Sequence, residues 1–198
     1  MQTREIVLAT GNPGKVRELQ FLLQDSGLIC RPQTEFNMPE AVEDGFSFVE
    51  NALKKARNAC KHTGLPAIAD DSGIEVDALN GEPGIYSARY AGAVCNDADN
   101  WQHLLNKLSE IDDPQRGARF VCVMVYLRHA RDPVPIICTG TWSGRILKSP
   151  RGDNGFGYDP VFFVPEHGVS AAELTAEQKN AISHRSKALS CLVDALTS

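Results

Sequence analysis

The chain has 198 residues, a formal net charge of −5 with neutral histidines, 42% hydrophobic residues and 23% charged residues. These values are ordinary for a globular protein and exclude wholesale disorder or a fibrous repeat. No apolar run approaches the roughly 20 residues of a membrane-spanning helix, and the apolar stretch at the start is too short for a signal peptide. An acidic chain is also a poor general binder of nucleic acid, because phosphate backbones attract Lys and Arg. We expect one domain over residues 1–198.

The six cysteines are spread along the chain without a Cys-x-x-Cys pair: Cys30, Cys60, Cys95, Cys122, Cys138 and Cys191. This spacing excludes a zinc finger and favours buried thiols in a reducing compartment. We therefore expect a cytoplasmic protein that needs no disulfide.

An apolar strand is predicted over residues 6–9, and it ends at a Gly-Asn-Pro turn. Asn12 suits a helix N-cap and Pro13 suits the first helical position, so a helix should follow. Its core-facing stripe includes Leu19 and Leu23. A short strand is then expected near residues 28–31.

The middle of the chain continues the alternation of helices and strands. Ser47 and Glu50 form a capping-box pattern that predicts a helix to about residue 62. An apolar strand over residues 65–69 should stop at Asp70-Asp71-Ser72-Gly73. Trp101, Leu104, Leu105 and Leu108 have the spacing of another helix.

The remaining elements are β-rich until the end of the chain. Residues 119–127 and 134–141 flank Asp132-Pro133 and predict a long antiparallel hairpin. A glycine-rich loop over 151–158 should lead to a strand over 161–164, and one last helix opens at Thr175 with Gln178 in a second capping box. The whole pattern predicts an α/β fold with a mixed sheet flanked by helices, and we expect two lobes around a cleft.

The first candidate site is the strand-to-helix turn, which consists of Thr10, Gly11, Asn12, Pro13, Gly14 and Lys15. Backbone N–H groups at a helix N-terminus, two glycines and a lysine suit phosphate oxygens. It is not a Walker loop, because Val16 stands where a Mg²⁺-binding Ser or Thr would be. The alternative is an ordinary capped turn with a surface lysine.

The second candidate is the acidic pair Asp70 and Asp71 with Ser72 directly after an apolar strand. Ligands gather at the carboxyl ends of strands in α/β sheets, and carboxylates there suit Mg²⁺. Adjacent residues at a strand end usually point apart, so we expect at most one acid to reach a metal. Alternatively, these side chains only cap backbone groups of a turn.

Two further groups of residues are weaker indications of a binding site when each is taken alone. The loop Gly155-Phe156-Gly157-Tyr158-Asp159 offers an aromatic stacking face, although a tight turn with Phe156 in the core is the alternative. Near the C-terminus, Lys179, Ser183, His184 and Arg185 could read a base or could form a solvated surface, and Lys54, Lys55 and Arg57 form a basic stretch that is usually solvated. Taken together, a phosphate nest, a carboxylate pair, a stacking aromatic and separate donors predict a nucleoside triphosphate site.

The motifs Thr10–Lys15, Ala69–Gly73, Pro83–Tyr90, Gly155–Pro160 and Ser183–Arg185 resemble, in the same order, those of the inosine triphosphate pyrophosphatase family. The resemblance covers nearly the whole chain. It implies an elongated α/β fold with a central cleft, a homodimer, and Mg²⁺-dependent hydrolysis of ITP, dITP and XTP to the monophosphate and pyrophosphate.

The same resemblance implies roles for individual residues. Thr10 to Lys15 would hold the triphosphate, and Lys55 would lie near the phosphates. Asp71 would be the catalytic base and a metal ligand, and the neighbouring Ser72 would contact the substrate. Phe156, Gly157, Tyr158, Asp159, Lys179, His184 and Arg185 would contact the nucleoside. One departure concerns the metal: Val42 occupies the position where the family commonly has a ligating acid, and Glu43 or Glu40 could substitute.

Three other functions compete with this reading. A Maf-like pyrophosphatase would act on modified pyrimidine or methylated nucleotides, and a regulatory module would bind a nucleotide without hydrolysing it. An RNA- or DNA-binding module would need a basic face, which the net charge disfavours.

Overall fold

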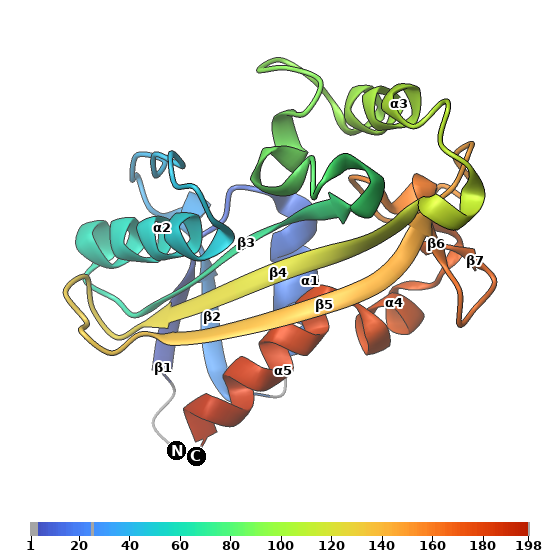
Figure 1. Ribbon diagram of the computed structural model, residues 1–198. Helices are drawn as coiled ribbons and strands as arrows, with labels where there is room; N and C mark the ends of the chain where they lie inside the picture. The colour runs from blue at the N-terminus through green and yellow to red at the C-terminus, as the bar shows by residue number, and fades with distance from the viewer. Residues whose placement is uncertain (1–3, 25, 198) are drawn as a thin grey trace. The chain divides into compact units, whose positions relative to one another are not determined.

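The computed structural model describes residues 4–24 and 26–197. Its main elements alternate along the chain as β1 (Arg4–Leu8), α1 (Pro13–Leu23), β2 (Leu28–Pro32), α2 (Phe48–Thr63), β3 (Ala67–Val76), α3 (Asp97–Lys107), β4 (Gly117–Leu127), β5 (Ile136–Ile146), β6 (Phe162–Val164), β7 (Val169–Ser170), α4 (Ala176–Ile182) and α5 (His184–Thr197) (Figure 1). Over these described ranges, the helices are all too short or too polar to cross a membrane.

The strands form one seven-stranded mixed sheet in the order β2-β1-β3-β4-β5-β6-β7. β1 is parallel to both β2 and β3, with Val7 opposite Ala67 in the latter pair. β6 is antiparallel to both β5 and β7. The predicted mixed α/β architecture is therefore confirmed.

The contacts between residues divide the chain into two compact units. Unit 1 takes the described residues up to Asp71, Cys122–Gly140 and those from Arg185 onward, and unit 2 takes Ser72–Val121 and Thr141–His184. The strands β3, β4 and β5 each contribute residues to both units. The expectation of one domain over the whole chain stays a prediction.

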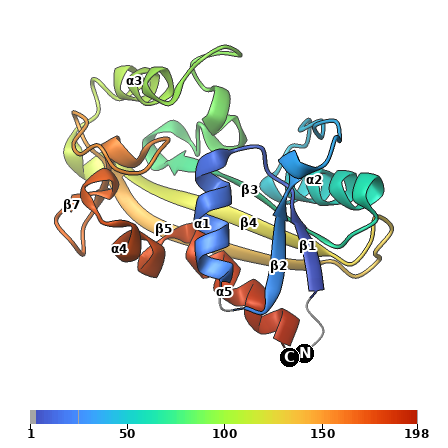
Figure 2. The same cartoon turned by 180° about the vertical axis from the view of Figure 1, so that it is seen from behind.

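Unit 1 buries apolar side chains on both faces of its part of the sheet, because successive residues of a strand point to opposite sides. Ile6 and Leu8 pack with residues of α1 and α5, whereas Val7 packs with the alanines of α2. Figures 1 and 2 show α2 and α1 on opposite sides of the sheet. Unit 1 is thus a helix–sheet–helix arrangement.

Unit 2 has a separate core rich in aromatic residues. Phe120, Trp142 and Phe162 pack together there, and α3 adds Leu104. Arg116 is only 2% exposed, and its guanidinium donates to the carbonyl groups of Leu108, Ile111, Ile146 and Leu147. This arginine satisfies backbone acceptors at the end of α3 and after β5.

Several helix starts agree with the sequence patterns. Asn12 accepts hydrogen bonds at the start of α1, Ser47 accepts from the Glu50 N–H at the start of α2, and Thr175 forms a complete capping box with Gln178. The strand β4 begins two residues before its predicted start, whereas β5 begins two residues after its predicted start and ends five residues beyond its predicted end.

Two element predictions were wrong. The strand expected to stop at Asp70 continues as β3 through Val76, because the buried carboxylates are compensated by cations from neighbouring helices. The single last helix is two helices, since Ser183 adopts an extended conformation (φ −67°, ψ 158°) that ends α4 before α5 begins. Lys179 and Arg185 therefore do not share a helix.

Candidate functional site

The turn from β1 into α1 has the geometry expected from its sequence. The Asn12 side-chain oxygen accepts from the N–H groups of Gly14 at 2.8 Å and Lys15 at 3.2 Å. The Thr10 hydroxyl oxygen accepts from the Asn12 N–H at 3.2 Å. A helix terminus with its N–H groups ordered in this way favours anions through both hydrogen bonding and the helix dipole.

Asp70 and Asp71 lie on opposite faces of β3. Asp70 shares its face with Ile68, toward α1 and α5, whereas Asp71 points toward α2. The two residues are 1% and 7% exposed. The expectation that adjacent acids point apart is confirmed, and the two carboxylates have different surroundings.

The Asp71 carboxylate is held by two residues of α2. It accepts from the Asn51 amide at 3.2 Å and from the Lys55 ammonium at 3.0 Å. The same ammonium donates to Glu43 at 3.0 Å. Burial raises the pKa of Asp71 despite the opposing charges of Lys55 and Lys15, whereas burial lowers the pKa of Lys55 but the nearby acids raise it on balance. Proton uptake by Asp71 is therefore easier than for an exposed aspartate.

The segment before α2 is fixed by Asn51 as well. The Gly45 N–H donates to the Asn51 side-chain oxygen at 2.9 Å. A Cβ atom on Gly45 would lie 2.7 Å from that oxygen, so only glycine fits. Asn51 thus ties the acidic loop that carries Glu43 to the Asp71 carboxylate.

Asp71 and Glu43 are the residues that could hold a divalent cation. Their carboxylates converge on one positive charge, the Lys55 ammonium, and hard oxygen donors of this kind suit Mg²⁺. Within the described ranges, three or more His, Cys, Asp or Glu side chains do not cluster as a complete metal site. A divalent cation held by these two carboxylates would need further ligands from other molecules.

On the other face of β3, Asp70 belongs to a row of alternating charges. Its Oδ2 atom lies 2.9 Å from the Lys15 ammonium and 3.5 Å from the Arg185 guanidinium. Arg185 also binds Glu18 of α1. Burial alone would raise the pKa of Asp70, but Lys15, Arg185 and Lys55 lower it below the ordinary value.

Unit 2 holds a second group of predicted site residues. The Asp159 carboxylate accepts from the Lys179 ammonium at 2.6 Å and from the Phe156 N–H at 2.9 Å. The ammonium also lies 4.7 Å from the centre of the half-buried Phe156 ring. Gly155 has φ +77°, and a Cβ there would meet Asp159 at 2.0 Å. This loop conformation requires glycine.

Other members of this second group are also held by residues of unit 2, two of them in its core. The His184 ring stacks on Phe120 with centroids 4.8 Å apart and planes inclined by 11°. The Tyr158 hydroxyl donates to the Ser87 carbonyl at 2.8 Å, and its ring is buried. The Gly157 N–H donates to Asp97 at 2.7 Å. Lys179 and His184 of unit 2 are buried, as is Arg185 of unit 1, so the alternative of a solvated surface is wrong.

Sequence reasoning missed three residues of these clusters: Asn51, Glu18 and Asp97. Asn51 lies one helical turn before Lys55, and Glu18 lies one turn after Lys15, so both were detectable as neighbours on the same helix face. Nothing in the local sequence around Asp97 indicates its bond to Gly157.

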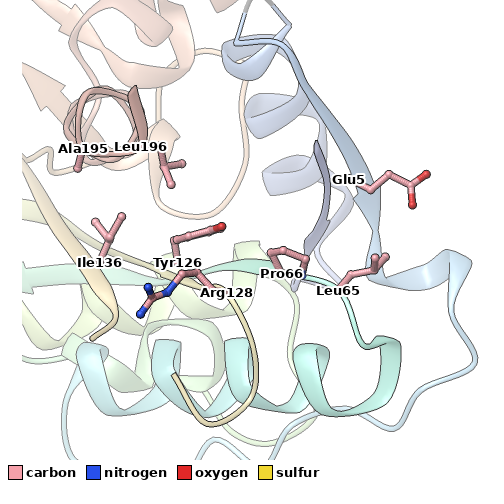
Figure 3. Close-up of a pocket in the computed structure, with 8 residues that line it drawn as sticks. All are labelled: Glu5, Leu65, Pro66, Tyr126, Arg128, Ile136, Ala195 and Leu196. Atoms are coloured by element: carbon pink, nitrogen blue, oxygen red, sulfur yellow. The ribbon is translucent and has the colours of Figure 1, made fainter. Parts of the chain in front are cut away.

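A separate pocket of about 550 Å³ lies in unit 1 (Figure 3). It is lined by Glu5, Leu65, Pro66, Tyr126, Arg128, Ile136, Ala195 and Leu196. It contains none of the residues that the sequence motifs assigned to a nucleotide, so the charged clusters remain the candidate site.

Comparison with known proteins gives concordant matches. The model of the Ham1 family matches residues 6–195. A dITP/XTP pyrophosphatase of Shigella flexneri is 60% identical over 98% of each chain, and one of Vibrio cholerae is 58% identical over 98% of this chain and 96% of its own.

Solved structures agree with these matches. A HAM1 protein from Coxiella burnetii has a TM-score of 0.91 and 52% identity, covering 98% of this chain and 99% of its own. A protein from Mycobacterium abscessus, described as a nucleoside-triphosphatase or dITP/XTP pyrophosphatase, has a TM-score of 0.76 and 45% identity over 95% and 98% of the two chains. With sequence, fold and family model in agreement over nearly its full length, this chain belongs to the Ham1 family.

Proposed function

We propose that this chain hydrolyses noncanonical purine nucleoside triphosphates (dITP, ITP and XTP) to the monophosphate and pyrophosphate. The observation that carries the proposal is the set of relatives at about 60% identity, named dITP/XTP pyrophosphatase. The charged clusters support it, because they combine phosphate-binding cations with an acid able to accept a proton. The proposed reaction cleanses the nucleotide pool and belongs in the cytoplasm.

The site residues of unit 1, which are Thr10, Lys15, Glu43, Lys55 and Asp71, form a unit 1 cluster that would bind the polyphosphate. The N–H groups at the start of α1, with Thr10 and Lys15, would contact phosphate oxygens, and Lys55 would stabilise the charge that develops on the departing pyrophosphate. Mg²⁺, held by Asp71 and Glu43, would neutralise phosphate charge and make a bound water more acidic.

Asp71 would accept the proton of the water that attacks the α-phosphorus. Its carboxylate lies beside the Lys55 ammonium at 3.0 Å, among the groups that would surround the phosphates, where a carboxylate can act as a general base. Asn51 fixes one of its oxygens at 3.2 Å, so the other oxygen is oriented toward Lys55 and the loop of Glu43. No covalent intermediate is required.

The unit 2 cluster would bind the nucleoside. Phe156 offers a ring face for stacking, and the Asp159–Lys179 pair fixes the loop that carries it. The group also includes His184, Gly157 and Tyr158. Ser72 would contact the substrate as well. Arg185, which belongs to unit 1, has only N–H donors, so it would favour the oxo group of hypoxanthine and xanthine over the amino group of adenine. We also propose that the active form is a homodimer, as the motif resemblance implies.

Release of pyrophosphate from a nucleotide panel tests this function. Purified protein is assayed with ITP, dITP, XTP, ATP, GTP, dUTP and 5-methyl-UTP, with Mg²⁺ and with a chelator. We expect pyrophosphate rather than orthophosphate, preference for the first three nucleotides, and no activity with the chelator. Preference for 5-methyl-UTP would instead support the Maf-like reading.

The variant Asp71→Asn distinguishes an enzyme from a binding module. We expect it to lower turnover about a hundredfold or more while ITP binding changes little. Asp132→Asn is the matched control, because Asp132 is a buried carboxylate outside both clusters. ITP binding without pyrophosphate release in the parent chain would favour a regulatory protein.

A further inference from the structure

Asp70 is a buried carboxylate for which the proposed reaction provides no role. It is 1% exposed in the interior of β3. A single oxygen, Oδ2, lies 2.9 Å from Lys15 of α1 and 3.5 Å from Arg185 of α5. The Cys122 thiol of β4 lies 4.0 Å from the same oxygen. Three separate elements therefore meet at one atom.

The surroundings of Asp70 show that it acts with charged partners. An isolated carboxylate in such a position would be expensive to bury, and Lys15 and Arg185 compensate it. Both cations are themselves largely buried, with side chains 15% and 3% exposed. Both cations therefore have one buried carboxylate as a common partner.

The two cations have different proposed tasks. Lys15 stands in the phosphate-binding turn, and Arg185 carries the donors that would read the base. Glu18, one helical turn after Lys15, binds the same Arg185. Asp70 and α1 together thus connect the cation at the phosphate end with the cation at the base end.

We infer that Asp70 is a positioning residue which couples phosphate binding by Lys15 to base discrimination by Arg185. The inference rests on the proposed function. It assigns Asp70 no contact with metal or substrate, in contrast to its neighbour Asp71. Its consequence is that loss of the Asp70 charge changes both the KM for the triphosphate and the preference for ITP over ATP.

A purely structural role makes a different prediction. If Asp70 only satisfies buried cations, its replacement lowers the stability of the fold. In the folded protein, KM and the ratio of kcat/KM for ITP to kcat/KM for ATP would then stay unchanged. Asp132 provides the reference for this case. It is 3% exposed and accepts from Arg128 at 2.7 Å and from two backbone N–H groups.

The experiment compares Asp70→Asn with Asp132→Asn in the full chain, at a temperature where denaturation curves show both to be folded. For Asp70→Asn we expect KM for ITP to rise about tenfold or more, and the ITP-to-ATP ratio in kcat/KM to fall by a similar factor. Asp132→Asn should change neither. Equal, unchanged kinetics in both variants would overturn the inference.

A second variant keeps the inference testable if Asp70→Asn does not fold. Lys15→Met removes the cation at the phosphate end and leaves Arg185 as the remaining partner of Asp70. Lys54→Met is the matched control, because the Lys54 side chain on α2 is 40% exposed. Coupling through Asp70 predicts that Lys15→Met changes the ITP-to-ATP ratio by at least about threefold. Direct phosphate binding alone predicts an equal rise in KM for both nucleotides, which would refute the coupling.

The proposed function fails separately from this inference. If the unaltered chain releases no pyrophosphate from ITP, the function is wrong. If the unaltered chain is active and both variants leave the ratio unchanged, only the role of Asp70 is wrong.

Discussion

Arg185 is 2% exposed and lies against the carboxylates of Glu18 and Asp70. Those charges fix the orientation of its donors. Truncation to alanine would leave the buried Asp70 and the partly buried Glu18 without this partner, at a cost of about 3–5 kcal/mol. A test of base reading therefore needs a substitution that retains length and polarity.

We predict that Arg185→Gln narrows the preference for ITP over ATP about tenfold or more. The glutamine amide has a donor and an acceptor, so its carbonyl can pair with the amino group of adenine. The measurement is kcat/KM for both nucleotides. Arg128→Gln is the control, because Arg128 also binds a buried aspartate but belongs to neither cluster. An unchanged ratio in Arg185→Gln would assign base reading to other residues.

Asp132 should contribute to stability in a pH-dependent way. Hydrogen bonds from the Arg128 side chain and from backbone N–H groups lower its pKa. A lowered pKa stabilises the fold above the ordinary value of about 4 and loses that contribution as the pH falls below it. We predict that the urea concentration at the midpoint of unfolding falls less between about pH 6 and pH 2 in Asp132→Asn than in the parent. Asp44→Asn should reduce this pH dependence less than Asp132→Asn does, because the Asp44–Lys54 pair that lowers the pKa of Asp44 is exposed and screened by solvent.

At the scale of elements, local signals predicted where helices begin but not where every element ends. Asn12, Ser47 and Thr175 cap helices because their side chains satisfy N–H groups within three residues, which the sequence displays directly. β3 continues past Asp70 because cations from α1 and α5 neutralise Asp70 and a cation from α2 neutralises Asp71. Those partners are distant in sequence, so no local pattern could reveal them.

The break at Ser183 has a similar explanation. Apolar spacing in the last segment suits a single helix, and serine is compatible with a helix, so periodicity alone gave one helix where two exist. The same error made the polar residues look like one solvated face. In fact Lys179 pairs with Asp159, and His184 stacks on Phe120.

The start of α1 provides the prediction at this scale. Asn12→Asp should retain the cap and change the free energy of unfolding by only a few tenths of a kcal/mol. It should raise KM for ITP roughly tenfold, because a carboxylate would then face the phosphates. Asn12→Ala should instead lose about 1 kcal/mol of stability. Urea denaturation and steady-state kinetics measure the two effects. If Asn12→Asp leaves KM unchanged, the phosphates do not bind at this turn.

At the scale of the molecule, composition and pattern predicted a mixed α/β protein, and the structure and its relatives confirm it. Which residues form each compact unit could not be predicted, because unit 1 takes three stretches of the chain that are distant in sequence. The division even falls within single strands, between Asp71 and Ser72 of β3 for example. Hydrophobic periodicity assigns a residue to an element, and it carries no information on such a division.

Continuity of β3, β4 and β5 through both units leads to a prediction about unfolding. A strand cannot lose its pairing in one half without removing support from the other, so we expect one cooperative transition. Leu192→Ala in the core of unit 1 and Leu104→Ala in the core of unit 2 should each lower stability by about 2–5 kcal/mol, since both side chains are fully buried. Phe46→Ala, at a residue that is 90% exposed, should change the stability by less than about 0.5 kcal/mol.

Circular dichroism and tryptophan fluorescence should give coincident urea curves for every variant. Two separate transitions, with each leucine variant shifting only one of them, would show that the units unfold independently and that residues 1–198 do not form a single domain.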